Sequence, residues 1–290
     1  MTRLPRTALA GATLALCCLG AQAVTLVGLT SANQLAHINM ANIGAATTTA
    51  ITGLAAGDRL VGIDLRPADG KLYGVSLSNK IYTINEASGA ATFVTALSSP
   101  VIDASLGYGI DFNPVADFAG GSSLRLVSSA GSNFAIHAGT GAVGNAASNI
   151  GSGYTGVAYS NSVIRPGSAP AGTALYYINA ATDVLMMAPG AFNNPTITAV
   201  GPLGVDALKA NGFEITADGM AYAALNLDAG SSLATGLYRI DLSTGAASQL
   251  GQYNGTLSGL TVSAVPEPQS LALMFAGLAA LGALARRRKA

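Results

Sequence analysis

The sequence predicts an all-β fold, a five-bladed β-propeller closed by pairing of the C-terminal strand with the N-terminal blade. A short motif recurs five times, at spacings of 47, 47, 56 and 47 residues. The copies are Gly62-Ile63-Asp64, Gly109-Ile110-Asp111, Gly156-Val157-Ala158, Gly212-Phe213-Glu214 and Gly259-Leu260-Thr261. A period in the forties, made of short strands, is typical of propeller blades. Only 10% of the residues are charged, and small residues are abundant, which favours strands and turns over a helical bundle.

Each repeat carries four strand signals. In the second blade we expect strands at 60–66, 71–76, 80–85 and 91–97. In the fifth blade we expect them at 213–216, 220–225, 237–241 and 247–253. Glycine follows the polar turn residues because tight hairpins require positive φ. The longer interval of 56 residues contains an insertion around residues 165–170.

The first blade is incomplete at its start. Residues 24–30 align with 70–76, which is a second strand of a blade. The missing first strand reappears at 257–263. We therefore expect the two segments to pair and close the ring, which removes the open sheet edges that would promote aggregation.

The N-terminal 23 residues predict a signal peptide for Sec-type export. Arg3 and Arg6 precede an apolar run at 7–19, and Ala21-Gln22-Ala23 forms a small-x-small cleavage site. The mature chain would then start at Val24 and contain no cysteine. An uncleaved anchor helix is the alternative, although the apolar run is short for a membrane span.

The C-terminal residues 265–290 predict a second targeting signal. Pro266, Glu267 and Pro268 are followed by an uncharged apolar run at 271–285. Its large apolar residues are Leu271, Leu273, Phe275, Leu278, Leu281 and Leu284, and the basic cluster Arg286, Arg287, Arg288 and Lys289 follows. The run is slightly shorter than the ~17–20 residues of a usual span, but long basic side chains can reach the headgroups. We expect one transmembrane helix with its cations on the cytoplasmic side; a buried terminal helix is the alternative.

This tripartite end resembles the PEP-CTERM sorting signal of Gram-negative bacteria. The resemblance implies recognition by an exosortase, a membrane cysteine transpeptidase or protease that would cleave near Pro266–Pro268. The precursor would be anchored in the inner membrane, and the product would reach the cell surface or the medium. Proteins with this signal occur alongside exopolysaccharide production, so the resemblance also implies exopolysaccharide as a partner.

The body, residues 24–264, resembles a family of secreted bacterial proteins known only as a domain of unknown function, numbered 4394. The stretches that carry the resemblance are GIDLRPADGKLYG at 62–74 and LYRID at 237–241. The resemblance implies a propeller-like β fold and supplies no activity.

Asp64, Asp111 and Glu214 occupy one repeat position in three blades. First strands line the channel of a propeller, so the three carboxylates could converge there. They could serve a glycosidase as base or nucleophile, acid and pKa modulator, or they could bind a hard cation. They could also accept hydrogen bonds in a purely structural role. Ala158 replaces the acid in another blade, and the body has no Trp for sugar stacking.

Other chemistry is sparse. The body has 8 Lys/Arg against 13 Asp/Glu, a net charge of −5, which argues against nucleic-acid binding. His37 and His137 fall at non-equivalent places, so we expect no metal site or cofactor. Asp69-Gly70 and Asp218-Gly219 lack the further acids of a calcium loop and predict plain turns.

Three hypotheses about function follow. The first is a non-enzymatic surface or matrix protein that binds polysaccharide or another matrix protein through its loop-rich face. The second is an extracellular glycosidase that uses Asp64, Asp111 and Glu214, and the third is a cation-binding or small-ligand propeller. Carboxyl groups within roughly 5–10 Å of one another in an accessible cavity would favour the second over the first.

Overall fold

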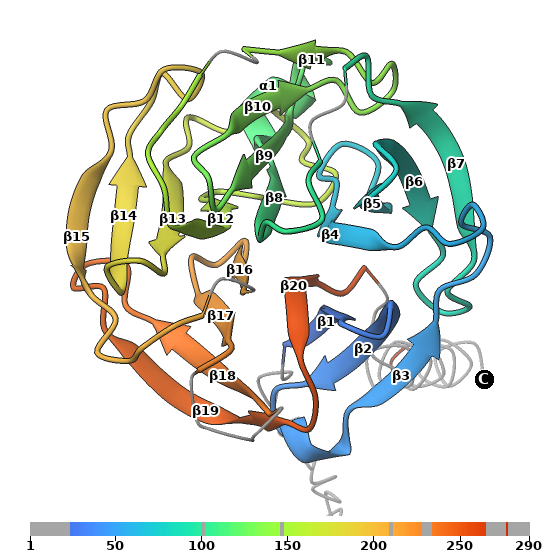
Figure 1. Cartoon of the computed structure of the whole chain (residues 1–290). Helices are drawn as coiled ribbons and strands as arrows, with labels where there is room; N and C mark the ends of the chain where they lie inside the picture. The colour runs from blue at the N-terminus through green and yellow to red at the C-terminus, as the bar shows by residue number, and fades with distance from the viewer. Residues whose placement is uncertain are drawn as a thin grey trace, which may run out of the picture.

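Five four-stranded antiparallel sheets are arranged around a central channel (Figure 1). The structure is a computed structural model, and it describes residues 24–99, 102–145, 148–208, 211–227, 234–264 and 277. The predicted all-β, five-bladed propeller is therefore confirmed.

In blades two to five the strands run outward from the channel in chain order, and in blade one β20 lies inside β1 to β3. Blade one is β20 (Leu257–Val262), β1 (Thr25–Thr30), β2 (Gln34–Asn39) and β3 (Thr47–Ala50). Blade two is β4 (Leu60–Leu65), β5 (Leu72–Ser76), β6 (Lys80–Ile84) and β7 (Ala91–Ala96). Blade three is β8 (Tyr108–Phe112), β9 (Leu124–Ser128), β10 (Asn133–Ile136) and β11 (Val143–Gly144). Blade four is β12 (Tyr154–Tyr159), β13 (Leu175–Asn179), β14 (Val184–Ala188) and β15 (Thr198–Pro202). Blade five is β16 (Gly212–Ile215), β17 (Ala221–Leu225), β18 (Thr235–Ile240) and β19 (Ala247–Tyr253).

The ring closes through β20 and β1, as predicted. The two strands pair antiparallel, with Leu26 opposite Val262 and Gly28 opposite Leu260. The backbone N–H of Ser263 donates to the carbonyl of Thr25 at 3.0 Å, just beyond the last strand pair. The inner edge of β1 is thus paired with β20, which is more than 200 residues away in the sequence.

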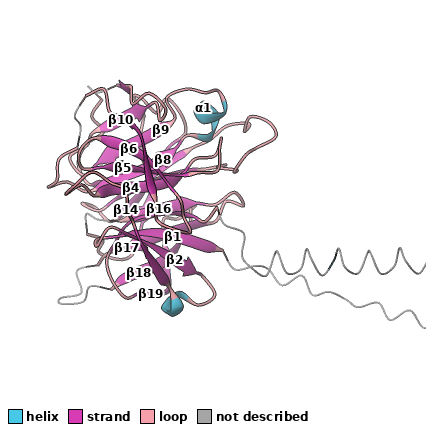
Figure 2. Ribbon diagram, turned by 90° about the vertical axis from the view of Figure 1, so that its right-hand side faces the viewer, coloured by secondary structure: helices cyan, strands magenta, loops and turns pink. Residues whose placement is uncertain are grey.

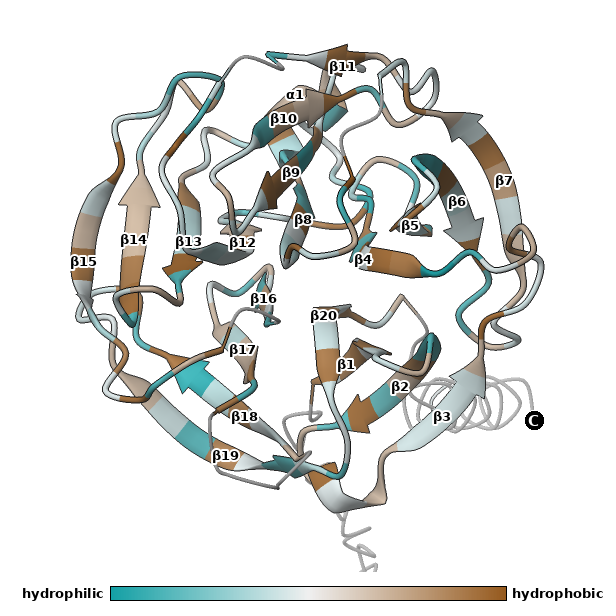
Figure 3. Cartoon of the chain, in the orientation of Figure 1, coloured by the Kyte–Doolittle hydropathy of each residue, from teal (hydrophilic) through white to brown (hydrophobic). Residues whose placement is uncertain are grey.

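Burial falls from the channel to the rim. Every residue of β4, β8 and β12 is buried, whereas β3, β7 and β15 are half-buried or exposed. Figure 3 shows brown, apolar segments on β4 and β9, and a paler β3 at the rim. Inner strands pack against the inner strands of neighbouring blades, so nearly all of their residues are buried, including the polar ones.

Helix is limited to two short elements in the described part of the chain (Figure 2). They are α1 (Pro114–Phe118) and the 3-10 turn η1 (Ile43–Ala45). The sequence analysis did not predict α1. It starts where Asn113 Oδ1 accepts the N–H groups of Val115 and Ala116 at 3.0 Å, and Pro114 occupies the first turn.

The predicted insertion lies between β12 and β13 and reaches back to blade two. The backbone N–H of Arg165 donates to the carbonyl of Pro67 at 2.7 Å. Its guanidinium donates to the carbonyl of Asp69 from Nε at 3.1 Å and from Nη2 at 2.9 Å. The insertion therefore ties blade four to the turn after β4.

An ion pair between the half-buried Arg66 and the buried Asp117 joins blades two and three. Arg66 Nε lies 2.7 Å from Asp117 Oδ1, and Asp117 also accepts the N–H of Ala68 and the hydroxyl of Ser123, both at 2.8 Å. Two of these four residues belong to the 62–74 stretch that carries the family resemblance. Their role is to hold blades together.

The predicted signal peptide, Pro266–Pro268 motif and basic cluster lie outside the described residues. Of the apolar run at 271–285, only Gly277 is described. Among the described residues, no helix has the length and apolar character needed to cross a membrane.

Candidate functional site at the channel acids

Asp64, Asp111 and Glu214 converge at the channel. One carboxylate oxygen of each lies within 4.8 Å of the other two. The three side chains come from β4, β8 and β16, and the residues are only 3%, 2% and 3% exposed. The predicted convergence is therefore present, but in a buried setting.

Each acid accepts a backbone hydrogen bond from the first strand of the next blade. Asp64 Oδ2 accepts the N–H of Phe112 at 2.8 Å, and Asp111 Oδ1 accepts the N–H of Tyr159 at 3.2 Å. Glu214 Oε2 accepts the N–H of Val262 at 3.2 Å. In all three cases the donor immediately follows the equivalent repeat position in the neighbouring blade. The repeated acid thus links adjacent blades, a structural role that explains its recurrence.

Thr261 occupies the same repeat position in blade one and bridges two of the acids. Its Oγ1 lies 2.8 Å from Asp64 Oδ1 and 2.9 Å from Glu214 Oε2, and it accepts the N–H of Leu65 at 3.1 Å. A hydroxyl has one proton, so it can donate to only one carboxylate. The other contact is a hydrogen bond only if that acid is protonated and donates to Oγ1. A proton on Asp64 or Glu214 lets both contacts be full hydrogen bonds at the same time.

The electrostatics of the cluster agree with this proton. Burial raises the pKa of Asp64 from 3.8 to about 7. Burial, and then the neighbouring charges of Asp64 and Glu214, raise the pKa of Asp111 well above its ordinary value. Burial, followed by the charge of Asp64, does the same to the pKa of Glu214. Carboxylates this close in a low-dielectric setting disfavour one another's ionisation.

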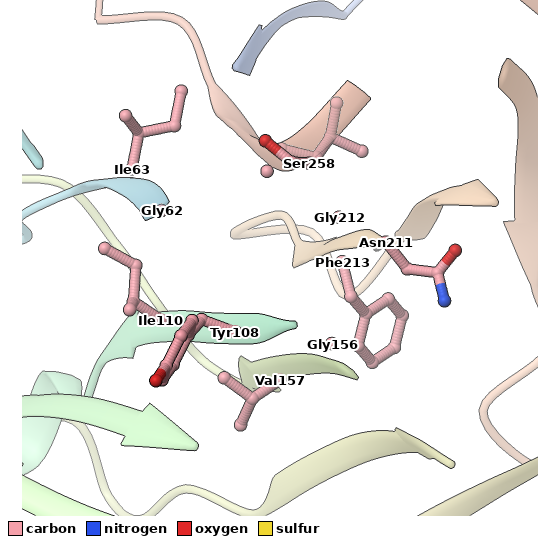
Figure 4. Close-up of a pocket in the computed structure, with 13 residues that line it drawn as sticks. Gly62, Ile63, Tyr108, Ile110, Gly156, Val157, Asn211, Gly212, Phe213 and Ser258 are labelled. Carbon is pink, nitrogen blue, oxygen red and sulfur yellow. The ribbon is translucent and has the colours of Figure 1, made fainter. Parts of the chain in front are cut away.

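The channel layer beside the acids is nearly filled. Figure 4 shows this layer, in which the five repeated glycines Gly62, Gly109, Gly156, Gly212 and Gly259 face the channel. The cavity there measures about 10 Å³, room for about one water molecule. A Cβ on Gly212 would lie 2.6 Å from the carbonyl carbon of Gly259. The glycines therefore allow the first strands to approach closely, and no sugar ring fits in this layer.

The histidines lie away from this cluster. His37 on β2 has Nε2 3.2 Å from Thr49 Oγ1, and its Nδ1 lies 3.8 Å from Glu86. His137 follows β10, and its Nδ1 accepts backbone N–H groups of the turn that it begins. Within the described residues, the three acids are the one group of three or more side chains that could hold a metal ion.

The two Asp-Gly pairs form turns, as predicted. Asp69 Oδ1 accepts the N–H of Lys71 at 3.0 Å, and Asp218 Oδ1 accepts that of Met220 at 3.3 Å. Gly70 has φ +65° and Gly219 φ +79°, which is the left-handed region that such turns require.

The sequence analysis missed Arg125. It is the only lysine or arginine that is buried among the described residues, and it lines a cleft away from the channel. The available signal was a lone cation between Leu124 and Leu126 in a strand of a charge-poor body.

These features define a five-bladed β-propeller whose first strands are tied together by side chains at the channel. A family model described as "Domain of unknown function (DUF4394)" matches residues 34–261, and the chain belongs to this family. A PEP-CTERM protein-sorting motif matches residues 264–289, which marks an exported protein that an exosortase sorts. Both resemblances drawn from the sequence are confirmed.

Comparison with curated proteins and solved structures adds no function. None of the curated proteins matches the chain. Regucalcin from Agrobacterium tumefaciens, a calcium-binding protein, is 16% identical with a TM-score of 0.42, over 77% of this chain and 68% of its own. A putative 6-phosphogluconolactonase from Bacteroides fragilis is 11% identical with a TM-score of 0.42, over 80% and 82%. A protein of unknown function from Bacteroides caccae is 11% identical with a TM-score of 0.41, over 83% and 98%. Likenesses at this level carry no argument about what this chain binds or does.

Proposed function

We propose that this protein is a non-enzymatic component of the cell surface or extracellular matrix that binds exopolysaccharide. The Sec-type machinery exports it, and residues 271–285 hold the precursor transiently in the inner membrane. An exosortase then cleaves near Pro266–Pro268 and releases the propeller. The sorting motif that follows directly on a closed propeller is the observation that carries this proposal.

The end of the fold supports cleavage at that place. Glu86, in the turn after β6, accepts the N–H of Ala264 at Oε2 at 2.9 Å, and its Oε1 accepts the hydroxyl of Ser263. The part of the chain that is hydrogen-bonded to the propeller therefore extends to within two residues of Pro266. Because proline disfavours helix at the residue before it, we expect the motif to be presented in the extended form that proteases bind.

The C-terminus of the mature protein tests the sorting proposal. Mass spectrometry of the full-length product, expressed in hosts with and without the exosortase, should show loss of residues 271–290 only when the enzyme is present. Recovery of Arg286–Lys289 on the surface-exposed protein would contradict cleavage. An identical truncated terminus in both hosts would contradict the exosortase assignment.

The burial of the acids argues against hydrolysis by these groups. A glycosidase needs its carboxyl groups beside the scissile bond, and here they are at most 3% exposed and engaged in inter-blade hydrogen bonds. We expect residues 24–264 to hydrolyse no glycan through these groups. The check is a glycan screen with Asp64→Asn, Asp111→Asn and Glu214→Gln beside the parent. Turnover that all three folded variants lose would instead establish the glycosidase hypothesis.

A further inference from the structure

We propose that a cleft between α1 and the loop after β14 binds a sugar that carries an oxyanion, a carboxylate or a sulfate, with Arg125 as the anion-binding residue. The cleft has a volume of about 480 Å³. Its polar and aromatic lining consists of Asn113, Ser122, Arg125, Phe192, Asn193 and Asn194. The inference rests on the proposed polysaccharide partner and names the chemical group that this protein recognises.

The first argument is the setting of Arg125. The residue is 4% exposed, and its guanidinium donates only to neutral oxygens. These are Tyr159 Oη at 3.2 Å from Nε, Asn133 Oδ1 at 3.0 Å from Nη1 and Asn193 Oδ1 at 2.9 Å from Nη2. Among the described residues, no carboxylate lies within 4.0 Å of it. Buried cations are normally paired with an anion, so this side chain brings an uncompensated positive charge to the cleft.

The nearest acid in the sheet does not compensate it. Asp111 is opposite Arg125 in the pairing of β8 with β9. However, Asp111 belongs to the channel cluster, where burial and the other two acids raise its pKa well above the ordinary value. Its Oδ1 accepts a backbone N–H from blade four rather than a guanidinium hydrogen bond. The positive charge therefore remains available to an external group.

Arg125 also has donors left over. A guanidinium has five N–H groups, and three of those of Arg125 are used, one on each nitrogen. One N–H on Nη1 and one on Nη2 thus have no acceptor in the described part of the chain. Two N–H groups on the terminal nitrogens of a planar fork match the two oxygens of a carboxylate or sulfate. The three neutral acceptors hold the fork in place.

The third argument is the remainder of the lining. The amides of Asn193 and Asn194 and the hydroxyl of Ser122 can both donate and accept, as sugar hydroxyls require. Phe192 adds apolar surface, which suits the C–H face of a sugar ring. A site for a free inorganic anion would not need this combination of amides and an aromatic ring. The cleft therefore suits an acidic sugar better than a simple ion.

The loop after β14, which carries Phe192, Asn193 and Asn194, is held in position by hydrogen bonds and ring packing. Asn133 Nδ2 donates to the carbonyl of Phe192 at 3.0 Å, and the ring of Phe192 meets Tyr159 edge-on at 5.0 Å between centroids. Asn194 N–H donates to the carbonyl of Ala191 at 2.8 Å, and Ala191 has φ +51°. Such a conformation is unfavourable for alanine and persists only where surrounding contacts impose it. Preorganisation of this kind lowers the entropic cost of binding.

Calorimetric titration of residues 24–264, which contain all twenty strands, tests the site. The ligands are an oligogalacturonate, its neutral methyl ester, a sulfated oligosaccharide and its desulfated form. Arg125→Lys keeps the charge and removes the fork. Asn194→Asp places a negative charge at the exposed rim of the cleft, and Asn254→Asp makes the same change in the exposed turn between β19 and β20. Circular dichroism and thermal unfolding verify that each variant is folded.

We expect at least one charged ligand to bind and its neutral counterpart to bind at least tenfold more weakly, as follows from the loss of hydrogen bonds to a charged group. Arg125→Lys and Asn194→Asp should each weaken that binding by about tenfold or more, and Asn254→Asp should leave it unchanged. The charged ligand that binds distinguishes the carboxylate from the sulfate. Equal binding of charged and neutral forms, or equal effects of Asn194→Asp and Asn254→Asp, would overturn the site and leave polysaccharide binding in place. Binding to none of the ligands would overturn the site, whereas failure of the sorting proposal would appear in the mass of the C-terminus.

Discussion

Replacing Asp64 by asparagine should make the propeller more stable at pH 8 relative to the parent, and the gain should shrink at pH 5. Asparagine mimics the protonated acid: its Oδ1 can accept the N–H of Phe112, and its Nδ2 can donate to Thr261 Oγ1. That hydroxyl then donates to Glu214, so every hydrogen bond of the cluster is kept. The variant differs from the parent in having no charge to lose or gain at this position.

The sign follows from the direction of the pKa change. The pKa of Asp64 is about 7 in the folded protein and 3.8 as its ordinary value, so the folded state binds the proton more tightly than the unfolded state. The stability that this proton contributes is fully present below about pH 4 and is lost as the pH rises to about 7. The total corresponds to about 4 kcal/mol, and about 3 kcal/mol of it falls between pH 5 and pH 8.

Urea unfolding of residues 24–264 and of Asp64→Asn at pH 5 and pH 8, at fixed ionic strength, measures the difference. We expect the stability of the variant relative to the parent to rise by about 3 kcal/mol from the lower to the higher pH. Asp241→Asn, at an exposed acid in the turn after β18, should show no such change. A difference that stays constant with pH, or a variant that loses stability at pH 8, would refute the idea that Asp64 is protonated in the folded protein.

Two further predictions concern the ring. Gly212→Ala should lower the free energy of unfolding by about 1–3 kcal/mol, because its Cβ would lie 2.6 Å from backbone atoms of Gly259 and Leu260. Gly259→Ala, whose Cβ would have no atom nearer than 3.4 Å, should change that free energy by less than about 1 kcal/mol. Equal losses of stability in thermal or urea unfolding would contradict the close approach of these strands. Deletion of residues 257–263 should expose the edge of β1, remove the Thr261 bridge and cause aggregation measurable by light scattering. A deletion variant that stays monomeric and folded would show that closure of the ring is dispensable.

The architecture could be predicted from the sequence because each blade repeats the same pattern of strands and turns. The spacing of 47 residues set the number of blades, and the incomplete first repeat located the closing strand at 257–263. Strand boundaries agreed to within about two residues in blades two and five, because turn residues with positive φ, such as Gly70, Gly89, Gly219 and Gly245, mark the connections between strands. The short helix α1 was missed because a single turn has no periodicity to detect, although Asn113-Pro114 is a recognisable start signal.

The candidate sites depended on contacts between distant segments. The repeat placed Asp64, Asp111 and Glu214 at one level of the channel, but it did not show that Thr261 would bridge two of them or that each acid would bind the next blade. Those contacts are set by the order and spacing of the first strands around the ring.

By itself, the sequence determined the fold class, the blade count, the mode of closure and the sorting motif, because each of these is encoded in contiguous or regularly spaced residues. Only the tertiary structure decided that the acids are buried and that Arg125 has no counter-ion among the described residues. The acceptors of Arg125 come from positions 133, 159 and 193, in two blades and a loop. Burial and charge pairing are properties of what surrounds a side chain, and in a propeller most of those surroundings come from other blades.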